Sequence, residues 1–206
     1  MIPHHPICLV VSAPSGAGKT SLTRALLAAE PNLRLSVSAT TRAPRPGEAH
    51  GTHYHFQTQP EFDALFAADG FLEAAHVFGR SYGSPRAPVQ AWLDAGHDVV
   101  FDIDWQGHRQ VRAALPDHVI GLFILPPSRE ALVERLTGRG DPSEAVAGRM
   151  ARATDEMIHA PEFDHVIVND DFATALAEIR AVLAAARVQR KRQTGLDAFL
   201  ARLCGS

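Results

Sequence analysis

A glycine-rich stretch near the start of the chain contains the residue types that bind phosphate. It runs from Ala13 to Thr20, follows an apolar run and ends in Gly-Lys-Thr. The phosphate-loop pattern requires a glycine, four residues and then Gly-Lys-Ser/Thr, and here Ala13 replaces the first glycine. Glycines let backbone N–H groups approach phosphate at a helix N-terminus, Lys19 adds a positive charge, and the Thr20 hydroxyl can bind Mg²⁺. The predicted triphosphate site comprises Ala13, Pro14, Ser15, Gly16, Ala17, Gly18, Lys19, Thr20 and Ser21.

Two aspartates occur at the end of a second apolar run, residues 99–103. Asp102 and Asp104 are two positions apart. Alternate residues of a strand point to the same side, so we expect both carboxylates on one face. Beside a phosphate loop, Asp102 is predicted to hold or support Mg²⁺ together with Thr20. Asp104 is then expected to face the acceptor of the phosphoryl group.

A region rich in arginine, proline and tyrosine contains donors suited to a second phosphate. Arg42 and Arg45 are three apart in a stretch stiffened by prolines, and Tyr54 and Tyr82 belong to the same region. A guanidinium fork matches the oxygens of a phosphate group. Two solvated loop arginines are the alternative interpretation, which would deserve about equal weight if the chain had no other phosphate site.

The elements that must position these residues follow an α/β pattern. Helical patterns occupy residues 19–29 and 130–136, and a third runs from Asp170 or Asp171 to about Gln193. Apolar runs that predict buried strands occupy residues 7–11, 99–103, 119–125 and 165–168. This alternation is typical of a parallel sheet covered by helices on both faces. We therefore expect an α/β fold with a parallel P-loop sheet flanked by helices.

Two stretches interrupt that pattern. Residues 37–87 are rich in Gly, Pro, Thr and His, with short alternating stretches around one small helix at 61–68. They predict a mixed β insertion that binds the acceptor. Residues 137–144 are irregular and suggest a mobile lid. The expected domains are a core of residues 1–36, 88–136 and 156–206, an insertion of residues 37–87 and a lid of residues 137–155.

Composition and charge exclude several classes of protein. The 206 residues are 46% hydrophobic with a net charge of −3, so no general basic field indicates a nucleic-acid polymer as partner. No apolar run approaches ~18 residues, which predicts no membrane span. Cys8 and Cys204 match no metal or redox spacing. We expect a cytoplasmic enzyme that acts on small molecules, and whether it forms a homo-oligomer stays open.

Longer stretches of the sequence resemble those of the bacterial guanylate kinases. The matching stretches are SAPSGAGKTSL, SVSATTRAPRPGE, HGTHYHF, FLEAAHVFGRSYGSP, DVVFDIDWQG, FILPPS, RLTGRG and VIVNDDF. They occur in the order of the family and span about Cys8 to Arg192, and the family tolerates alanine at the position of Ala13. The resemblance implies transfer of the γ-phosphate of ATP to GMP and dGMP, with Mg²⁺ as cofactor, in purine nucleotide metabolism.

The resemblance also implies roles for individual residues. The family's ligands of the GMP phosphate match Arg42, Arg45, Tyr54 and Tyr82. Its readers of the guanine ring match Ser38, Glu73 and Ser84, with Asp104 close by. Its lid arginines match Arg139 and Arg149, and Asn169 matches a residue near the adenine of ATP. The residues expected to carry catalysis are Lys19, Arg42, Arg139, Arg149 and Asp102.

Guanine offers two adjacent donors, N1–H and N2–H₂, and the single carboxylate of Glu73 can accept from both. Adenine lacks this donor pair and would leave the carboxylate unsatisfied, and such a mismatch can reject the wrong partner by ~10⁴ or more. Without the resemblance, Glu73 would be interpreted as an exposed strand residue.

The sequence departs from the commonest family pattern at two places. Gly148 stands where a lysine is frequent, and Arg80-Ser81 stand where an Asn-Tyr pair is common. Two rival functions remain: a different phosphotransferase, such as a ribose bisphosphate kinase, and a non-catalytic module that binds protein ligands through the acceptor pocket. A signalling GTPase is disfavoured, because no Asn-Lys-x-Asp motif occurs.

Overall fold

A five-stranded parallel sheet forms the centre of the molecule. The computed structural model describes residues 2–77, 79–138 and 143–205, with the backbone alone at 143–146. The strand order is β2-β7-β1-β8-β9. Their bounds are β1 Cys8–Ser12, β2 Leu33–Leu35, β7 Asp98–Asp102, β8 Val119–Leu125 and β9 His165–Val168. All four predicted strands are confirmed, and β2, which is too short for a sequence pattern, was missed.

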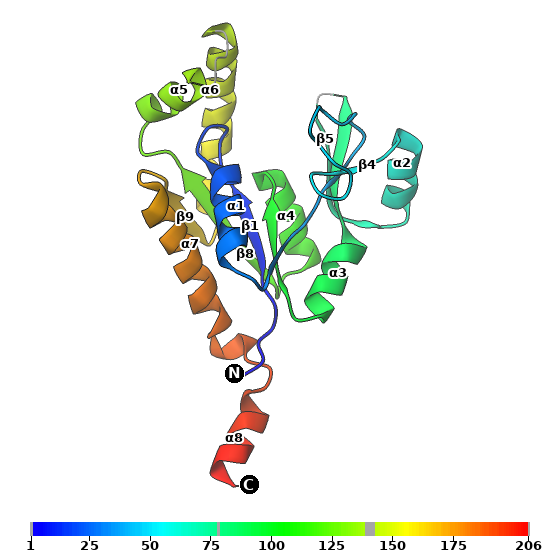
Figure 1. Cartoon of the computed structure of the whole chain (residues 1–206), viewed down its shortest axis with the longest axis vertical. Helices are drawn as coiled ribbons and strands as arrows, with labels where there is room; N and C mark the ends of the chain where they lie inside the picture. Colours follow the sequence, from blue (N-terminus) through cyan, green and yellow to red (C-terminus); the bar gives the residue numbers. More distant parts are fainter. Residues whose placement is uncertain (1, 78, 139–142, 206) are drawn as a thin grey trace.

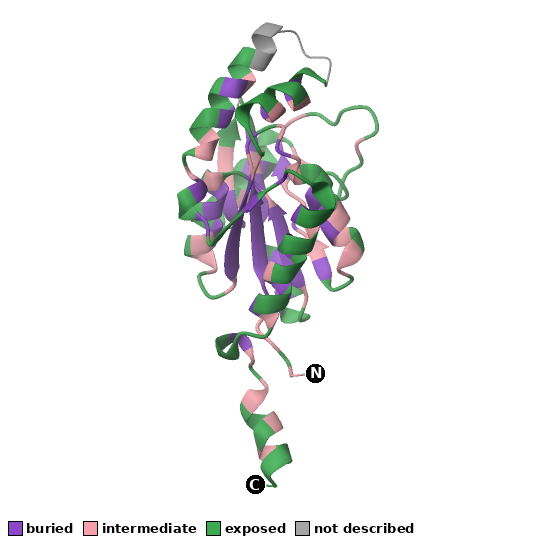
Figure 2. Ribbon diagram, turned by 90° about the vertical axis from the view of Figure 1, so that its left-hand side faces the viewer, coloured by how far each residue is buried: buried purple, intermediate pink, exposed green. Residues whose placement is uncertain are grey.

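Helices cover both faces of this sheet, as the unbroken apolar runs predict. Helices α1 (Lys19–Ala29) and α7 (Phe172–Arg187) bury one face, where Leu9, Leu26 and Ile179 belong to a single apolar cluster. Helices α3 (Arg86–Asp94) and α4 (Trp105–Ala114) pack on the opposite face against Phe101 and its neighbours. The buried strands lie at the centre of Figure 2, in purple, with exposed helical faces around them.

A second, smaller sheet lies beside the core, on the right of Figure 1. Its strand order is β4-β3-β6-β5, and it contains both parallel and antiparallel pairs. The bounds are β3 Ala39–Thr40, β4 His55–Phe56, α2 Gln59–Ala67, β5 Phe71–Val77 and β6 Arg80–Pro85. A capping box between Thr58 and Glu61 begins α2. The expected mixed β structure around one small helix is therefore confirmed.

Two further helices project from the sheet at the top of Figure 1. Helix α5 spans Arg129–Thr137, and α6 spans Ser143–Met157 and leads into a short 3₁₀ turn, Ala160–Glu162. Most of the stretch expected to be a lid, residues 137–155, is therefore helical, while Arg139 lies outside the described residues. Among the described residues, no helix is long and apolar enough to cross a membrane.

The expected long C-terminal helix is wrong at its end. Helix α7 begins after its Asp171 cap as predicted, but it ends at Arg187 and not near Gln193. A 3₁₀ turn, Arg190–Arg192, and a separate helix α8, Leu196–Cys204, follow. Hydrogen bonds of the 3₁₀ type follow the end of the helix, with the Gln189 N–H donating to the Ala186 carbonyl at 3.2 Å and the Arg192 N–H to the Gln189 carbonyl at 2.9 Å. The N-terminal arm contacts this turn, because the His5 N–H donates to the Arg192 carbonyl at 2.6 Å.

Candidate active site

The phosphate loop joins β1 to α1 at the carboxyl end of the sheet. Gly16 and Gly18 adopt φ values of +93° and +97°, a left-handed conformation that favours glycine. The buried Asn169 side chain supports the loop, because its Nδ2 donates to the Ala17 carbonyl at 2.7 Å. A Cβ on Gly18 would lie 2.4 Å from that Nδ2 atom. Strand β9 therefore fixes the shape of the loop through Asn169, which follows its last residue.

Lys19 and Thr20 lie next to Asp102, as the paired motifs predict. The Lys19 ammonium is 2.7 Å from Asp102 Oδ1 and also donates to the Ile103 carbonyl at 3.1 Å. The Thr20 hydroxyl is 3.5 Å from Asp102 Oδ2. The parallel pairing of β1 with β7 produces this arrangement, since Val11 is the partner of Asp102 in the sheet.

These oxygen atoms form a donor set suited to Mg²⁺. One hydroxyl and one carboxylate are ligands that Mg²⁺ accepts beside the phosphates of a substrate. The described residues contain no group of three His, Cys, Asp or Glu side chains placed to hold a metal. A Mg²⁺ ion at Thr20 and Asp102 would therefore need phosphate oxygens to complete its coordination.

The expectation that Asp104 shares a strand face with Asp102 is wrong. Strand β7 ends at Asp102, and Asp104 is the N-cap of α4, where its Oδ1 accepts from the Gly107 N–H at 2.8 Å. The start of a helix leaves N–H groups unpaired, and the Asp104 carboxylate satisfies one of them.

A pocket of about 580 Å³ joins the phosphate loop to the insertion. The predicted residues that line it are Lys19, Thr20, Ser38, Tyr54 and Asp102. Ser21 follows Thr20 on α1 and is exposed. The sequence therefore predicted residues on both sides of one cavity.

Arg42 is held by a carboxylate that the sequence reasoning did not single out. Its Nη2 atom lies 2.8 and 2.9 Å from the two oxygens of Glu48, and the Arg45 N–H donates to the same carboxylate at 2.7 Å. These bonds lower the pKa of Glu48 to about 2. The guanidinium also lies 5.4 Å from the Tyr54 ring, which is 6.2 Å from the ring of Tyr82. An acid six positions after Arg42, across a Pro-Gly turn, was the available signal for Glu48.

Glu73 is a buried carboxylate, and its interpretation as an exposed strand residue is wrong. It is 7% exposed, on β5 opposite Ser84 of β6, and the Ser84 hydroxyl donates to it at 2.8 Å. Burial raises the pKa of Glu73 to about 7, and the charge of Asp104 acts in the same direction. A buried carboxylate is costly unless donors satisfy its oxygens. The Ser84 hydroxyl occupies only part of its acceptor capacity, so the carboxylate can accept from further donors.

Helix α6 contributes a second residue that the sequence reasoning missed. The Ser15 N–H of the phosphate loop donates to Glu156 Oε2 at 3.2 Å. Burial raises the pKa of Glu156, while the nearby Lys19 charge opposes that rise. Arg149 lies half-buried on the same helix. Because 141 positions separate Ser15 from Glu156, no local pattern indicated their contact.

The fold and the pocket define a class of enzyme. A phosphate loop at the carboxyl end of a parallel sheet faces a pocket that it shares with an insertion, where Ser38 and Tyr54 line the pocket. The same insertion carries Arg42 and the buried Glu73 carboxylate, which are not among the lining residues of that pocket. This is the architecture of a P-loop phosphotransferase that acts on a small phosphorylated acceptor.

Comparison with known proteins identifies the family within that class. The guanylate kinase sequence profile matches residues 6–186. A guanylate kinase of Granulibacter bethesdensis is 57% identical over 96% of this chain and 92% of its own length, and one of Gluconobacter oxydans is 58% identical over 95% and 94%. A crystal structure of guanylate kinase from Anaplasma phagocytophilum superposes with a TM-score of 0.80 at 34% identity, covering 98% of this chain and 96% of that one. The chain belongs to the guanylate kinase family.

Proposed function

We propose that this chain transfers the γ-phosphate of ATP to GMP and dGMP, giving ADP and the guanosine diphosphate. The observation that carries the acceptor assignment is the buried Glu73 carboxylate, paired with Ser84 in the insertion. Its oxygens match the two adjacent N–H donors of guanine, whereas adenine offers no such pair. Family membership supports the same reaction. The chain then acts in purine nucleotide metabolism, in the cytoplasm.

The donor half of the site is the phosphate loop with Lys19. Backbone N–H groups from Ala13 to Ser21 bind the ATP phosphates, and the Lys19 ammonium neutralises charge on them. Asn169 acts mainly by holding the loop, since its amide bonds the Ala17 carbonyl. Thr20 and Asp102 would hold Mg²⁺, which would supply positive charge to the phosphate oxygens.

The acceptor half is the insertion, residues 37–87. Arg42, Arg45, Tyr54 and Tyr82 bind the GMP phosphate, and the contact between Arg42 and the Tyr54 ring supports this assignment. Ser38 and Glu73 read the guanine ring, with Ser84 orienting the Glu73 carboxylate. Asp104 acts through the electrostatic field at Glu73, because its own carboxylate is engaged as a helix cap.

Catalysis rests on positioning and charge stabilisation. Two phosphates repel each other strongly at reacting distance, and the guanidinium groups of Arg42, Arg139 and Arg149 offset that repulsion. Closure of a lid, residues 137–155, over the core would exclude water and bring its arginines to the transferring phosphoryl group. The protein forms no covalent intermediate in this scheme.

An acceptor panel tests the proposal. ADP release is measured with MgATP and GMP, dGMP, AMP, CMP or ribose bisphosphate, for the wild type and for Glu73→Gln. GMP should be the best acceptor of the wild type, and Glu73→Gln should lose selectivity for GMP while ATP binding persists. A better acceptor than GMP would indicate another phosphotransferase, and no turnover with any acceptor would indicate a non-catalytic binding module.

A further inference from the structure

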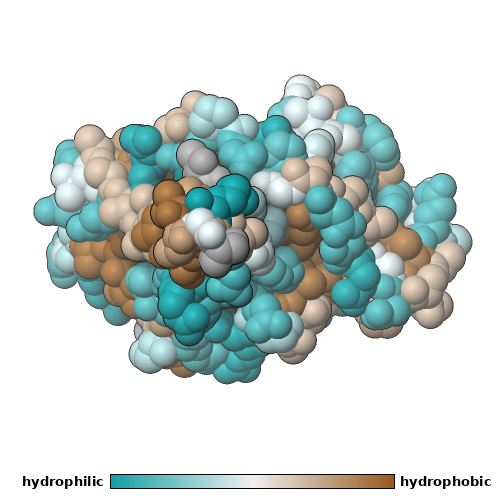
Figure 3. All heavy atoms as spheres, turned by 90° about the horizontal axis from the view of Figure 1, so that it is seen from below, coloured by the Kyte–Doolittle hydropathy of each residue, from teal (hydrophilic) through white to brown (hydrophobic). Residues whose placement is uncertain are grey.

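A second pocket lies at the end of the sheet opposite the phosphate loop. Its volume is about 470 Å³, within the range of small-ligand sites. It is lined at the amino ends of β8 and β9, by residues such as Ile120 and His165, and by the 3₁₀ turn that follows α7. Figure 3 views this end of the molecule from below, where hydrophilic side chains cover much of the surface around the projecting α8. Strand β8 has seven residues, so roughly 20 Å separate this pocket from the phosphate loop.

The feature that points to a ligand is the side chain of Arg192. It lines the pocket and is only 5% exposed. Its Nε and Nη1 atoms are buried, and no acceptor in the described part of the chain lies within hydrogen-bonding distance of either. Burial lowers the pKa of Arg192, although the charges of Asp98, Asp117 and Asp164 act in the opposite direction. An anion in the pocket would meet the guanidinium at Nη2, which is not among these sealed atoms, and its charge would offset the cost of burying Arg192.

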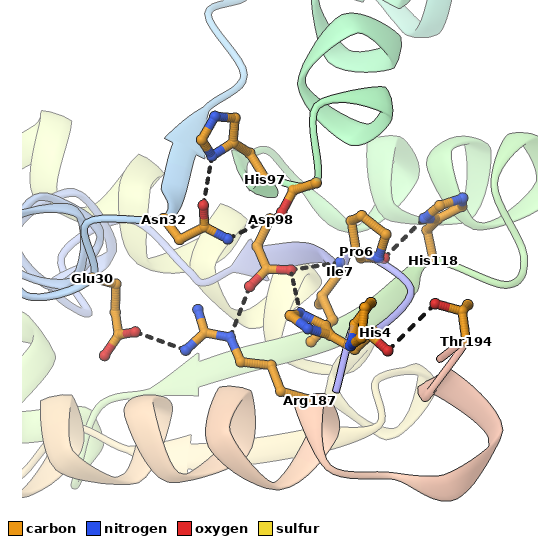
Figure 4. Close-up of polar contacts among 12 residues, drawn as sticks. His4, Pro6, Ile7, Glu30, Asn32, His97, Asp98, His118, Arg187 and Thr194 are labelled. Carbon is orange, nitrogen blue, oxygen red and sulfur yellow. Dashed lines mark hydrogen bonds and ion pairs between the residues drawn. The ribbon is translucent and has the colours of Figure 1, made fainter. Parts of the chain in front are cut away.

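The contrast with a neighbouring buried charge is informative. Asp98 is fully buried at the same end of the sheet, and Figure 4 shows the hydrogen-bond and ion-pair partners of its carboxylate. It accepts from the Ile7 N–H and from Arg187 Nε, both at 2.8 Å, and Arg187 also pairs with Glu30. The fold thus supplies hydrogen-bonding partners for the buried Asp98 carboxylate, but not for Nε and Nη1 of the buried Arg192.

The other charged groups of the pocket leave it net positive. Arg112 and Asp164 pair with each other, and Asp164 also accepts from the Gly121 N–H. Lys191 and Asp117 are both exposed lining residues of opposite charge, so they offset one another. The remaining charge is that of the buried Arg192 guanidinium, so the lining carries a net positive charge. A buried Nδ1 of His5, also without a described partner, adds another polar atom on the same lining.

We propose that this pocket is a binding site for a small phosphate-bearing anion, with Arg192 as its principal ligand and Lys191 at its rim. A guanidinium N–H forms a charge-assisted hydrogen bond to a phosphate oxygen, and the pocket has room for a phosphate group on a small molecule. This site is separate from both halves of the catalytic pocket and does not depend on the reaction proposed above.

Titration with inorganic phosphate tests this site, and two-dimensional ¹H–¹⁵N NMR of the full chain monitors the binding. The catalytic pocket is first filled with MgADP and GMP, and sodium chloride is used as an ionic-strength control. Saturable shifts are expected at the amides of Ile120, Asp164, His165 and Arg192. An absence of saturable shifts there would overturn the proposal and would mean that water alone satisfies Arg192.

Two variants and a matched control identify the ligand residues. Arg192→Gln should weaken phosphate binding at least about tenfold, which is about 1.4 kcal/mol, and Lys191→Gln should weaken it less. Arg190→Gln changes an exposed arginine of the same 3₁₀ turn that does not line the pocket, and it should bind as the wild type does. Equal binding by all three variants would overturn the assignment. If Arg192→Gln does not fold, the comparison of Lys191→Gln with Arg190→Gln retains the test.

Discussion

At the scale of single residues, the buried carboxylate of Glu73 links acceptor binding to pH. Its pKa is raised to about 7 in the free protein, mainly by burial. Guanine donors require the ionised form, so GMP binding must release a proton when the pH is below that value. GMP affinity should therefore be highest above pH 7 and fall towards pH 5, by up to about tenfold per pH unit.

Calorimetry in buffers of different ionisation enthalpy measures this proton release directly. The GMP phosphate also titrates in this range, and Glu73→Gln is the control because it retains that titration and removes the step due to the carboxylate. Identical pH dependence in the wild type and Glu73→Gln would contradict the assignment.

Arg42 offers a second prediction at this scale. Glu48 holds its guanidinium in place, and a lysine ammonium cannot reproduce the planar fork. Arg42→Lys should raise the KM for GMP by about ten- to a hundredfold and leave the KM for ATP within about twofold. Arg80→Lys is the matched control, since Arg80 is exposed on β6 of the same sheet. Steady-state kinetics with each substrate varied in turn would reject the role of Arg42 if both KM values rose together.

At the scale of elements, α6 places a negative charge where a phosphate should bind. The Glu156 carboxylate accepts the Ser15 N–H that the loop would offer to ATP. Removing this charge should relieve repulsion of the triphosphate. Glu156→Gln is therefore expected to tighten ATP binding by about three- to tenfold at pH 8, measured by titration calorimetry without GMP.

Asp155→Asn is the control for Glu156→Gln, because it removes an exposed charge from the neighbouring position of the same helix. It should change ATP affinity little. Weaker ATP binding by Glu156→Gln would mean that Glu156 supports the shape of the loop and does not compete with the phosphates.

At the scale of the whole molecule, the ion pairs around Asp98 tie distant segments together. Arg187 connects α7 to β7 through Asp98 and to the end of α1 through Glu30. Arg187→Met would leave the fully buried Asp98 carboxylate without its cation, so the free energy of unfolding should fall by about 3–5 kcal/mol.

Urea unfolding measures this loss, and Arg180→Met is its control. Arg180 pairs with the same Glu30 but is half exposed, so its removal should cost less than about 1 kcal/mol. Because Arg187 lies at the amino ends of the strands, Arg187→Met should keep its activity at temperatures where it stays folded. Similar unfolding free energies for the two variants would refute the argument.

The sequence by itself determined the features that depend on local order. The motif from Ala13 to Thr20 specified the phosphate loop, and left-handed φ values at Gly16 and Gly18 agree with its glycines. Unbroken apolar runs located four strands of the main sheet, because a strand covered on both faces is apolar throughout. The order of eight longer stretches identified the family, which the comparisons confirm.

Only the tertiary structure decided which groups are buried and which distant groups meet. Alternation along a strand could not show that Glu73 is buried. The sequence pattern also could not show that the turn after α7 contacts the N-terminal arm at Arg192. The contacts of Glu156 with the phosphate loop and of Arg187 with Asp98 join residues 141 and 89 positions apart. The physical reason is that burial and electrostatic environment depend on which chain segments pack together, and a local pattern contains no record of that packing.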